Sequence, residues 1–178
     1  MKYIKPLIVA LLLCAFYPGL SFADPLNDAV TAISDKDFKK ACDLLIPLAE
    51  ENNLSAKNLL GLLYFKGEGV EQDVAKGLSM IMDAAKQGYD PAKANALALT
   101  SELAALGEPV AMFNAGFMCL KGWGGEQDPN VCVKLIEKSG ESGHAKSAKF
   151  LASLYKNGKY GIPPNKEKAD YWDSKIQE

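Results

Sequence analysis

The fold is decided by residues 54–69, which read LSAKNLLGLLYFKGEG. Two later stretches repeat this pattern: residues 109–125 read PVAMFNAGFMCLKGWGG, and residues 145–161 read AKSAKFLASLYKNGKYG. Each stretch places small and large apolar residues at helical spacing and then ends in glycines, which terminate helices. The corresponding positions Cys119 and Tyr155 are 36 residues apart, which is the period of a solenoid built from pairs of helices.

A second helix is predicted after each of these three stretches. Asp73, Asp128 and Asn165 precede the second helices at positions suited to capping their first turns. Small residues such as Gly61 and Gly116 allow the second helix to approach the first closely, so each copy is predicted to be an antiparallel helix pair.

The repeat is interrupted once. The interval from Tyr64 to Cys119 is 55 residues, and residues 91–106 fill the excess with one alanine-rich helix that has no partner of the first type. Residues 27–52 are predicted to form a leading helix or helix pair. The sequence therefore predicts an all-α fold with one extra helix between the first and second clear repeats.

The amino-terminal 23 residues have the pattern of a secretory signal peptide. Lys2 and Lys5 precede an apolar run at residues 7–16, and cleavage is expected between Ala23 and Asp24. We therefore expect a periplasmic or secreted protein without stable membrane insertion after cleavage. An uncleaved anchor and a lipoprotein tethered through Cys14 are the alternatives.

Composition disfavours two classes of function. The 178 residues carry a net charge of −2 and no arginine, whereas nucleic-acid-binding proteins are usually basic, so no nucleic-acid partner is expected. His144 is the only histidine and sits in a predicted turn. Without a histidine cluster or a cysteine quartet we expect no metal, no cofactor and no enzymatic activity.

The ordered small, Leu-Gly, Tyr, Gly-x-Gly, Asp and Lys-Ala/Gly positions resemble the Sel1-like repeat family, a relative of the tetratricopeptide repeats. The resemblance implies a short right-handed α-solenoid of antiparallel helix pairs. Its single domain would span residues 24–178, with repeats at 54–90, 109–143 and 144–176.

The resemblance also bears on the cysteines. Cys119 takes the place of Tyr64, and Cys132 takes the place of Gly77, two positions that should face each other across the helix pair. Because export favours oxidation, a Cys119–Cys132 disulfide is expected. Two buried reduced thiols are the alternative, and Cys42 is expected to be a buried apolar residue or a link to a partner chain.

In the related repeats the first helix of each pair lines a concave face. The register of the repeat then predicts a surface that binds a protein or peptide, with an apolar centre and a lysine-rich end. Its members are Asn58, Leu62, Phe65, Lys66, Phe113, Phe117, Leu120, Lys121, Lys149, Ser153 and Lys156. The alternative for Phe113 and Phe117 is that they pack against the extra helix at residues 91–106.

The resemblance implies an interaction module that acts as adaptor, inhibitor or scaffold and is a monomer when free of its partner. One form is an immunity protein that neutralises a secreted toxic effector such as a phospholipase. A β-lactam-binding or β-lactam-hydrolysing enzyme of the cysteine-rich type is an alternative, although this chain has one candidate cysteine pair and no serine–lysine or metal constellation. A structural role in the cell envelope is another.

Overall fold

The computed structural model describes residues 24–125 and 128–176, and the predicted signal peptide at residues 1–23 lies outside this part. The described part is helical apart from an isolated bridge between Lys159 and Ile162. Its helices are α2 (Pro25–Ser34), α3 (Phe38–Glu50), α4 (Leu54–Lys66), α5 (Val74–Lys86), α6 (Asp90–Ala105), α7 (Pro109–Leu120), α8 (Pro129–Glu141), α9 (Ala145–Asn157) and α10 (Lys166–Ser174).

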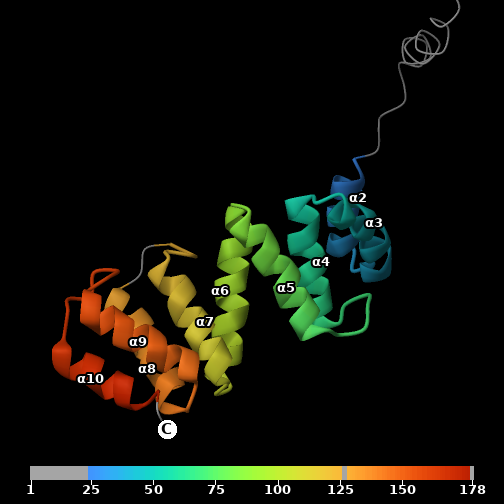
Figure 1. Cartoon of the computed structure of the whole chain (residues 1–178). Coiled ribbons are helices and arrows are strands. Elements are labelled where there is room, and N and C mark those ends of the chain that lie inside the picture. The colour runs from blue at the N-terminus through green and yellow to red at the C-terminus, as the bar shows by residue number, and fades with distance from the viewer. Residues whose placement is uncertain (1–23, 126–127, 177–178) are drawn as a thin grey trace, which may run out of the picture.

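These helices form consecutive antiparallel pairs. The pairs are α2–α3, α4–α5, α7–α8 and α9–α10, and Figure 1 shows them following one another from the blue to the red end of the chain. Helix α6 stands alone and packs against α5 on one side and α7 on the other. The predicted all-α solenoid with one extra helix is confirmed, and the leading segment is a helix pair.

Glycine allows the paired helices to approach closely. A Cβ added at Gly61 of α4 would lie 2.7 Å from the Ile81 side chain, and one added at Gly116 of α7 would lie 2.5 Å from the Ile136 side chain. Both glycines also face a backbone carbonyl of the second helix at less than 3 Å from the added Cβ. The two helices of the α4–α5 pair are therefore packed in the same way as those of the α7–α8 pair. In each, glycine leaves room for an isoleucine and the adjacent backbone of the second helix.

The predicted caps of the second helices are also present. The side chain of Asp73 accepts a hydrogen bond from the Lys76 backbone N–H at 2.8 Å, and that of Asn165 accepts one from the Lys168 N–H at 2.9 Å. Asp128 accepts one from the Asn130 N–H at 2.9 Å. Each cap satisfies a backbone donor that the first turn of a helix leaves unpaired.

The disulfide expected between Cys119 and Cys132 joins α7 to α8, with a Cα–Cα distance of 5.5 Å. Tyr64 and Tyr155 occupy the position of Cys119 in the neighbouring pairs, and each lies beneath a lysine ammonium, at 3.9 Å from Lys76 and 4.8 Å from Lys168. The middle pair thus replaces a lysine–tyrosine contact with a covalent bond.

Cys42 is buried in α3 as a free thiol, and its sulfur lies 3.7 Å from the carbonyl oxygen of Glu68. Burial raises the pKa of this thiol, which favours the neutral form. Within residues 24–125 and 128–176 no helix has the length and apolar character that crossing a membrane requires.

Candidate functional site

The extra helix covers part of the predicted binding surface. Asn58 was expected to point outward, but it is only 4% exposed, and its side-chain oxygen accepts a hydrogen bond from Asn95 of α6 at 2.9 Å. Leu62 packs against a core cluster that includes Ala92 and Ala96 of α6. The outward placement of Asn58 was therefore wrong, because α6 occupies the space in front of α4.

The outward placement of Phe65 was also wrong. Phe65 is 8% exposed, and its backbone lies against Gly77 of α5, where an added Cβ would come within 2.6 Å of the Phe65 nitrogen. Lys66, the next residue, is exposed. The α4 end of the predicted surface is therefore largely interior.

Phe113 is buried as well, at 5% exposure, and its predicted outward position is corrected in the same way. Its neighbour is α9, since it belongs to the core cluster that contains Leu151 and Tyr155. Phe113 thus packs toward the next repeat, and the alternative that it packs against the extra helix is not what the structure shows.

Around Phe113 the structure assembles a group of aromatic rings. Phe113 and Phe117 of α7 stack with ring centroids 6.0 Å apart, and Phe150 of α9 packs edge-on against them at 5.9 Å and 5.6 Å. Tyr160, which follows α9, lies 6.4 Å from Phe150. Phe117, Phe150 and Tyr160 are half-buried, so the group is open to solvent on its outer side.

Tyr160 reaches this group from a tight turn. Tyr160 and Gly161 have φ values of 54° and 77°, and the Ile162 N–H donates to the Lys159 carbonyl at 2.9 Å. Two successive positive φ angles between paired residues define a type I′ turn, in which Asn-Gly is the favoured sequence. An aromatic residue in the left-handed region costs about 1–3 kcal/mol, and such strain is concentrated at functional sites.

Two lysines border the rings. The Lys121 ammonium lies 5.5 Å from the centroid of Phe117 and 5.2 Å from that of Tyr160, and the Lys146 ammonium lies 5.0 Å from the centroid of Phe113. Neither forms an ion pair with a carboxylate of the described residues. Each charge is therefore available to a ligand that also contacts the rings.

We call Phe117, Lys121, Lys146, Phe150 and Tyr160 the lysine–aromatic patch. Phe117 and Lys121 belong to the surface that the repeat register predicts, whereas Lys146, Phe150 and Tyr160 were missed. The signal for two of them is in the sequence, because Lys146 and Phe150 lie one turn apart beside the predicted Lys149 and Lys156 on α9. Leu120 is half-buried against the core, while Lys149, Ser153 and Lys156 are exposed.

His144 lies beneath the patch in a buried polar network. Ser147 donates its hydroxyl hydrogen to Ser139 at 2.7 Å, and Ser139 donates to the Pro109 carbonyl. The His144 Nδ1 lies 2.8 Å from Ser147, whose hydrogen is already committed, so we assign the hydrogen of that bond to Nδ1. Nδ1 then donates and does not act as a base, which makes this serine–histidine group a structural link between α7, α8 and α9.

This network predicts a pH dependence of stability. Burial, and secondarily the nearby Lys146 charge, lower the pKa of His144 below its ordinary 6.5. The unfolded chain then binds the proton more readily than the folded chain does. The stability that depends on neutral His144 is therefore fully present above about pH 6.5 and is lost as the pH falls below that value. Urea unfolding should show that lowering the pH from about 7 to 5 destabilises the wild type more than His144→Asn. If both proteins lost the same free energy of unfolding over this pH range, the pKa of His144 would not be lowered in the folded state.

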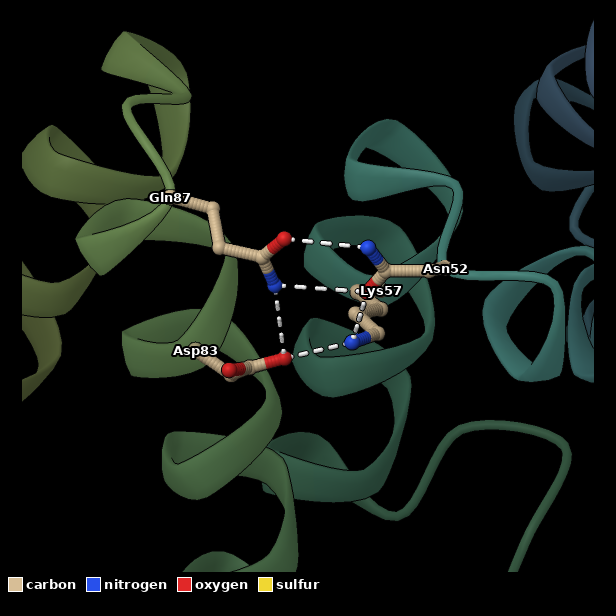
Figure 2. Close-up of polar contacts among 4 residues, drawn as sticks. All are labelled: Asn52, Lys57, Asp83 and Gln87. Carbon is tan, nitrogen blue, oxygen red and sulfur yellow. Dashed lines mark hydrogen bonds and ion pairs between the residues drawn. The ribbon is translucent and has the colours of Figure 1, made fainter.

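A second polar group lies at the other end of the molecule, where Figure 2 shows Asn52, Lys57, Asp83 and Gln87 bound to one another. The Lys57 ammonium pairs with Asp83, and this bond is the main reason that the pKa of Asp83 is lowered. An open hollow of about 540 Å³ adjoins the pair and includes Leu78 and Met82. Because Lys57 is already neutralised, this region offers an anionic ligand less than the lysine–aromatic patch does.

In the described part of the chain no three histidine, cysteine, aspartate or glutamate side chains gather in a way that could hold a metal ion. The features that stand out are therefore a helical scaffold and one charged, aromatic surface.

Comparison with known proteins agrees with this architecture. The Sel1 repeat matches residues 54–89, 109–144 and 145–172, which together make up more than half of the chain. The comparison with curated proteins gave no match.

The solved structures that are similar to the chain include two repeat proteins. One is a protective antigen of uropathogenic Escherichia coli strains with an SLR fold, at 26% identity and a TM-score of 0.43 over 78% of this chain. The chain spans only about 33% of that protein's length. The other is a Sel1 repeat protein from Oxalobacter formigenes, at 23% identity and a TM-score of 0.41 over 93% of this chain and 77% of that one. On the three matched repeats, the chain belongs to the Sel1 repeat family.

Proposed function

We propose that this protein is an interaction module that binds a segment of a protein partner on the lysine–aromatic patch. The observation that carries the proposal is the set of half-buried rings of Phe117, Phe150 and Tyr160 bordered by unpaired lysines. Aromatic anchors are enriched in protein-binding hot spots, and charges beside them direct the choice of partner. The family agrees with this role, because Sel1-repeat proteins generally act as protein-interaction scaffolds.

Tyr160 supports the proposal from a different direction. The turn that holds it would be easier to form with asparagine at position 160, because asparagine tolerates a φ of 54° better than tyrosine does. The tyrosine ring nevertheless extends the patch toward Lys121, at 5.2 Å from its ammonium. Backbone strain that brings a ring to a surface is consistent with selection for binding at this residue.

The variant Tyr160→Asn therefore separates binding from folding. Asparagine relieves the φ strain but loses the packing of the ring against the core, so we expect a thermal midpoint close to that of the wild type. Its retention of the partner from an extract of the source cells should fall at least about tenfold, since hot-spot truncations cost about 2 kcal/mol or more. The matched control is Tyr171→Asn, which removes an exposed tyrosine of α10 outside the patch. Equal partner retention by Tyr160→Asn and the wild type, measured by quantitative mass spectrometry, would contradict the proposed site.

We further propose that the protein works after export, in the periplasm or outside the cell, as an adaptor, an inhibitor or a scaffold. An immunity protein that neutralises a secreted effector is one form of the inhibitor role. Asp24, the expected first residue after cleavage, caps α2 by accepting a hydrogen bond from the Leu26 N–H at 3.1 Å. Cleavage before Asp24 would thus leave the first helix with its cap.

Mass spectrometry of the protein purified from cell envelopes tests this location. We expect a mature chain that begins at Asp24. An intact Met1 or a lipidated Cys14 in the purified protein would contradict the expected cleavage.

A further inference from the structure

We infer that the partner segment which the lysine–aromatic patch receives is acidic and carries an apolar or aromatic side chain among its carboxylates. This inference rests on the proposed function and names the chemistry of the ligand.

The segments that carry the patch have charges of one sign. Residues 109–125 and 142–165, which supply α7, α9, the first part of the segment between α7 and α8 and the turn after α9, contain no aspartate or glutamate, whereas Glu126 and Asp128 follow in the rest of the α7–α8 segment. The same two segments contain five exposed lysines, none of which forms an ion pair with a described carboxylate. They are Lys121, Lys146, Lys149, Lys156 and Lys159.

This excess is local, because the whole chain carries a net charge of −2. In the rest of the described chain acidic residues are interspersed with the lysines, and some of those lysines form ion pairs, as in Lys57–Asp83 and Lys168–Glu137. Asp173 of α10 lines a hollow together with Lys149 and Lys156 but forms no ion pair with either. A ligand that brings carboxylates would therefore meet charges that the protein leaves unneutralised.

The spacing of the lysines suits an extended peptide. Lys146 and Lys156 begin and end an exposed stripe on α9, and at 1.5 Å per residue they lie about 15 Å apart along the helix axis. An extended chain covers about 15 Å in four or five residues at 3.3 Å each. Lys156 borders α10, whereas Phe150 follows Lys146 by one turn on the same face of α9, and Lys121 lies 5.5 Å from the centroid of Phe117. Carboxylates near Lys146 and Lys121 would therefore place an intervening side chain over the rings.

The aromatic centre favours a side chain over a nucleotide base. Phe117 and Phe150 pack edge-on at an interplanar angle of 86°, so their faces are not parallel and offer no slot for a flat base. Stacking on a free aromatic face is how proteins hold single-stranded nucleic acid. The shallow apolar surface between two rings of this kind fits an aliphatic side chain or the edge of another ring.

The test uses a short fluorescent peptide in which one phenylalanine is flanked by two glutamates on each side. One matched peptide replaces the glutamates with glutamine, and another replaces the phenylalanine with alanine. We expect measurable binding of the first peptide by fluorescence anisotropy, and affinity at least about tenfold lower for each matched peptide. Raising sodium chloride from about 50 to 500 mM should lower the affinity for the first peptide, because salt screens the attraction between its glutamates and the surface lysines.

The protein variants locate the effect. Replacing Lys121, Lys146 and Lys149 together with glutamine should lower affinity for the acidic peptide about tenfold, at about half a kcal/mol per exposed pair. The matched control replaces Lys66 of α4 and Lys134 and Lys138 of α8 with glutamine; all three are exposed and lie outside the ring contacts, and their loss should change affinity less than about twofold. Equal thermal midpoints of the two variants show that the comparison is between folded proteins.

Three outcomes would overturn the inference: equal binding of the glutamine peptide, equal loss in the control variant, or tighter binding of a single-stranded oligonucleotide than of the acidic peptide. The effects of the variants on the natural partner distinguish a failure of this inference from a failure of the proposed function. If the natural partner loses affinity on Tyr160→Asn but not on replacement of the lysines, the patch is the site and its ligand is not acidic. If neither change affects the partner, the site itself is wrong.

Discussion

Replacing Trp172 with alanine is expected to lower the free energy of unfolding by about 3–5 kcal/mol, the range for a large aromatic residue lost from a core. Trp172 is 2% exposed and lies on Gly140 of α8, where an added Cβ would be 2.5 Å from the ring. Ala169 and Trp172 are the buried residues of α10, so this one ring supplies most of the apolar contact that holds α10 to the repeat before it.

The control is Tyr171→Ala, which removes a neighbouring ring that is 46% exposed and should cost less than about 1 kcal/mol. Urea unfolding followed by circular dichroism measures both changes. If the two variants lost similar stability, Trp172 would not anchor the end of the solenoid as described.

Removing the disulfide with Cys119→Ala and Cys132→Ala should lower the free energy of unfolding by about 3 kcal/mol, because the bridge closes a short loop in the unfolded chain. Treating the wild-type protein with a reductant under unfolding conditions should produce a loss of similar size. The same urea titration measures both.

The neighbouring repeats predict how to recover this stability without a disulfide. Relative to the caps Asp73, Asp128 and Asn165, Val131 occupies the position of Lys76 and Lys168. Val131 is 52% exposed, so its side chain can be lengthened without entering the core.

We therefore expect Cys119→Tyr, Val131→Lys and Cys132→Ala together to be more stable than the double alanine variant by about 1–2 kcal/mol. The tyrosine restores the missing ring, and a lysine over such a ring contributes about 0.5–1 kcal/mol. If this triple variant were no more stable than the double alanine variant, the disulfide and the lysine–tyrosine contact would not be alternative solutions at one position.

The sequence was sufficient to predict the features that depend on local spacing. The helix pairs, the caps at Asp73 and Asn165 and the glycines that let paired helices approach closely all follow from residues at fixed offsets within one repeat. The disulfide follows from comparing two repeats, because Cys119 and Cys132 replace two facing positions together. Each of these inferences needs only the geometry of a single helix pair.

The binding surface could not be predicted equally well, because it depends on how neighbouring pairs are packed. Helix α4 is apolar on nearly all sides, with Leu59, Leu60, Leu62 and Leu63 in succession, and such a helix is covered by more than one neighbour. This pattern is typical of a helix without an open face, which agrees with the burial of Asn58 and Phe65. The position of Tyr160 in a turn with positive φ has no comparable signal, since tyrosine is not a residue typical of such turns.

Amide hydrogen exchange of the protein in complex with its captured partner tests the central claim most directly. We predict slower exchange on binding in the second half of α7, in residues 121–125, along α9 and in the turn at residues 158–162, with α2 to α5 unchanged. Protection confined to α2–α5, around the hollow beside Lys57 and Asp83, would contradict the claim that the lysine–aromatic patch is the binding surface.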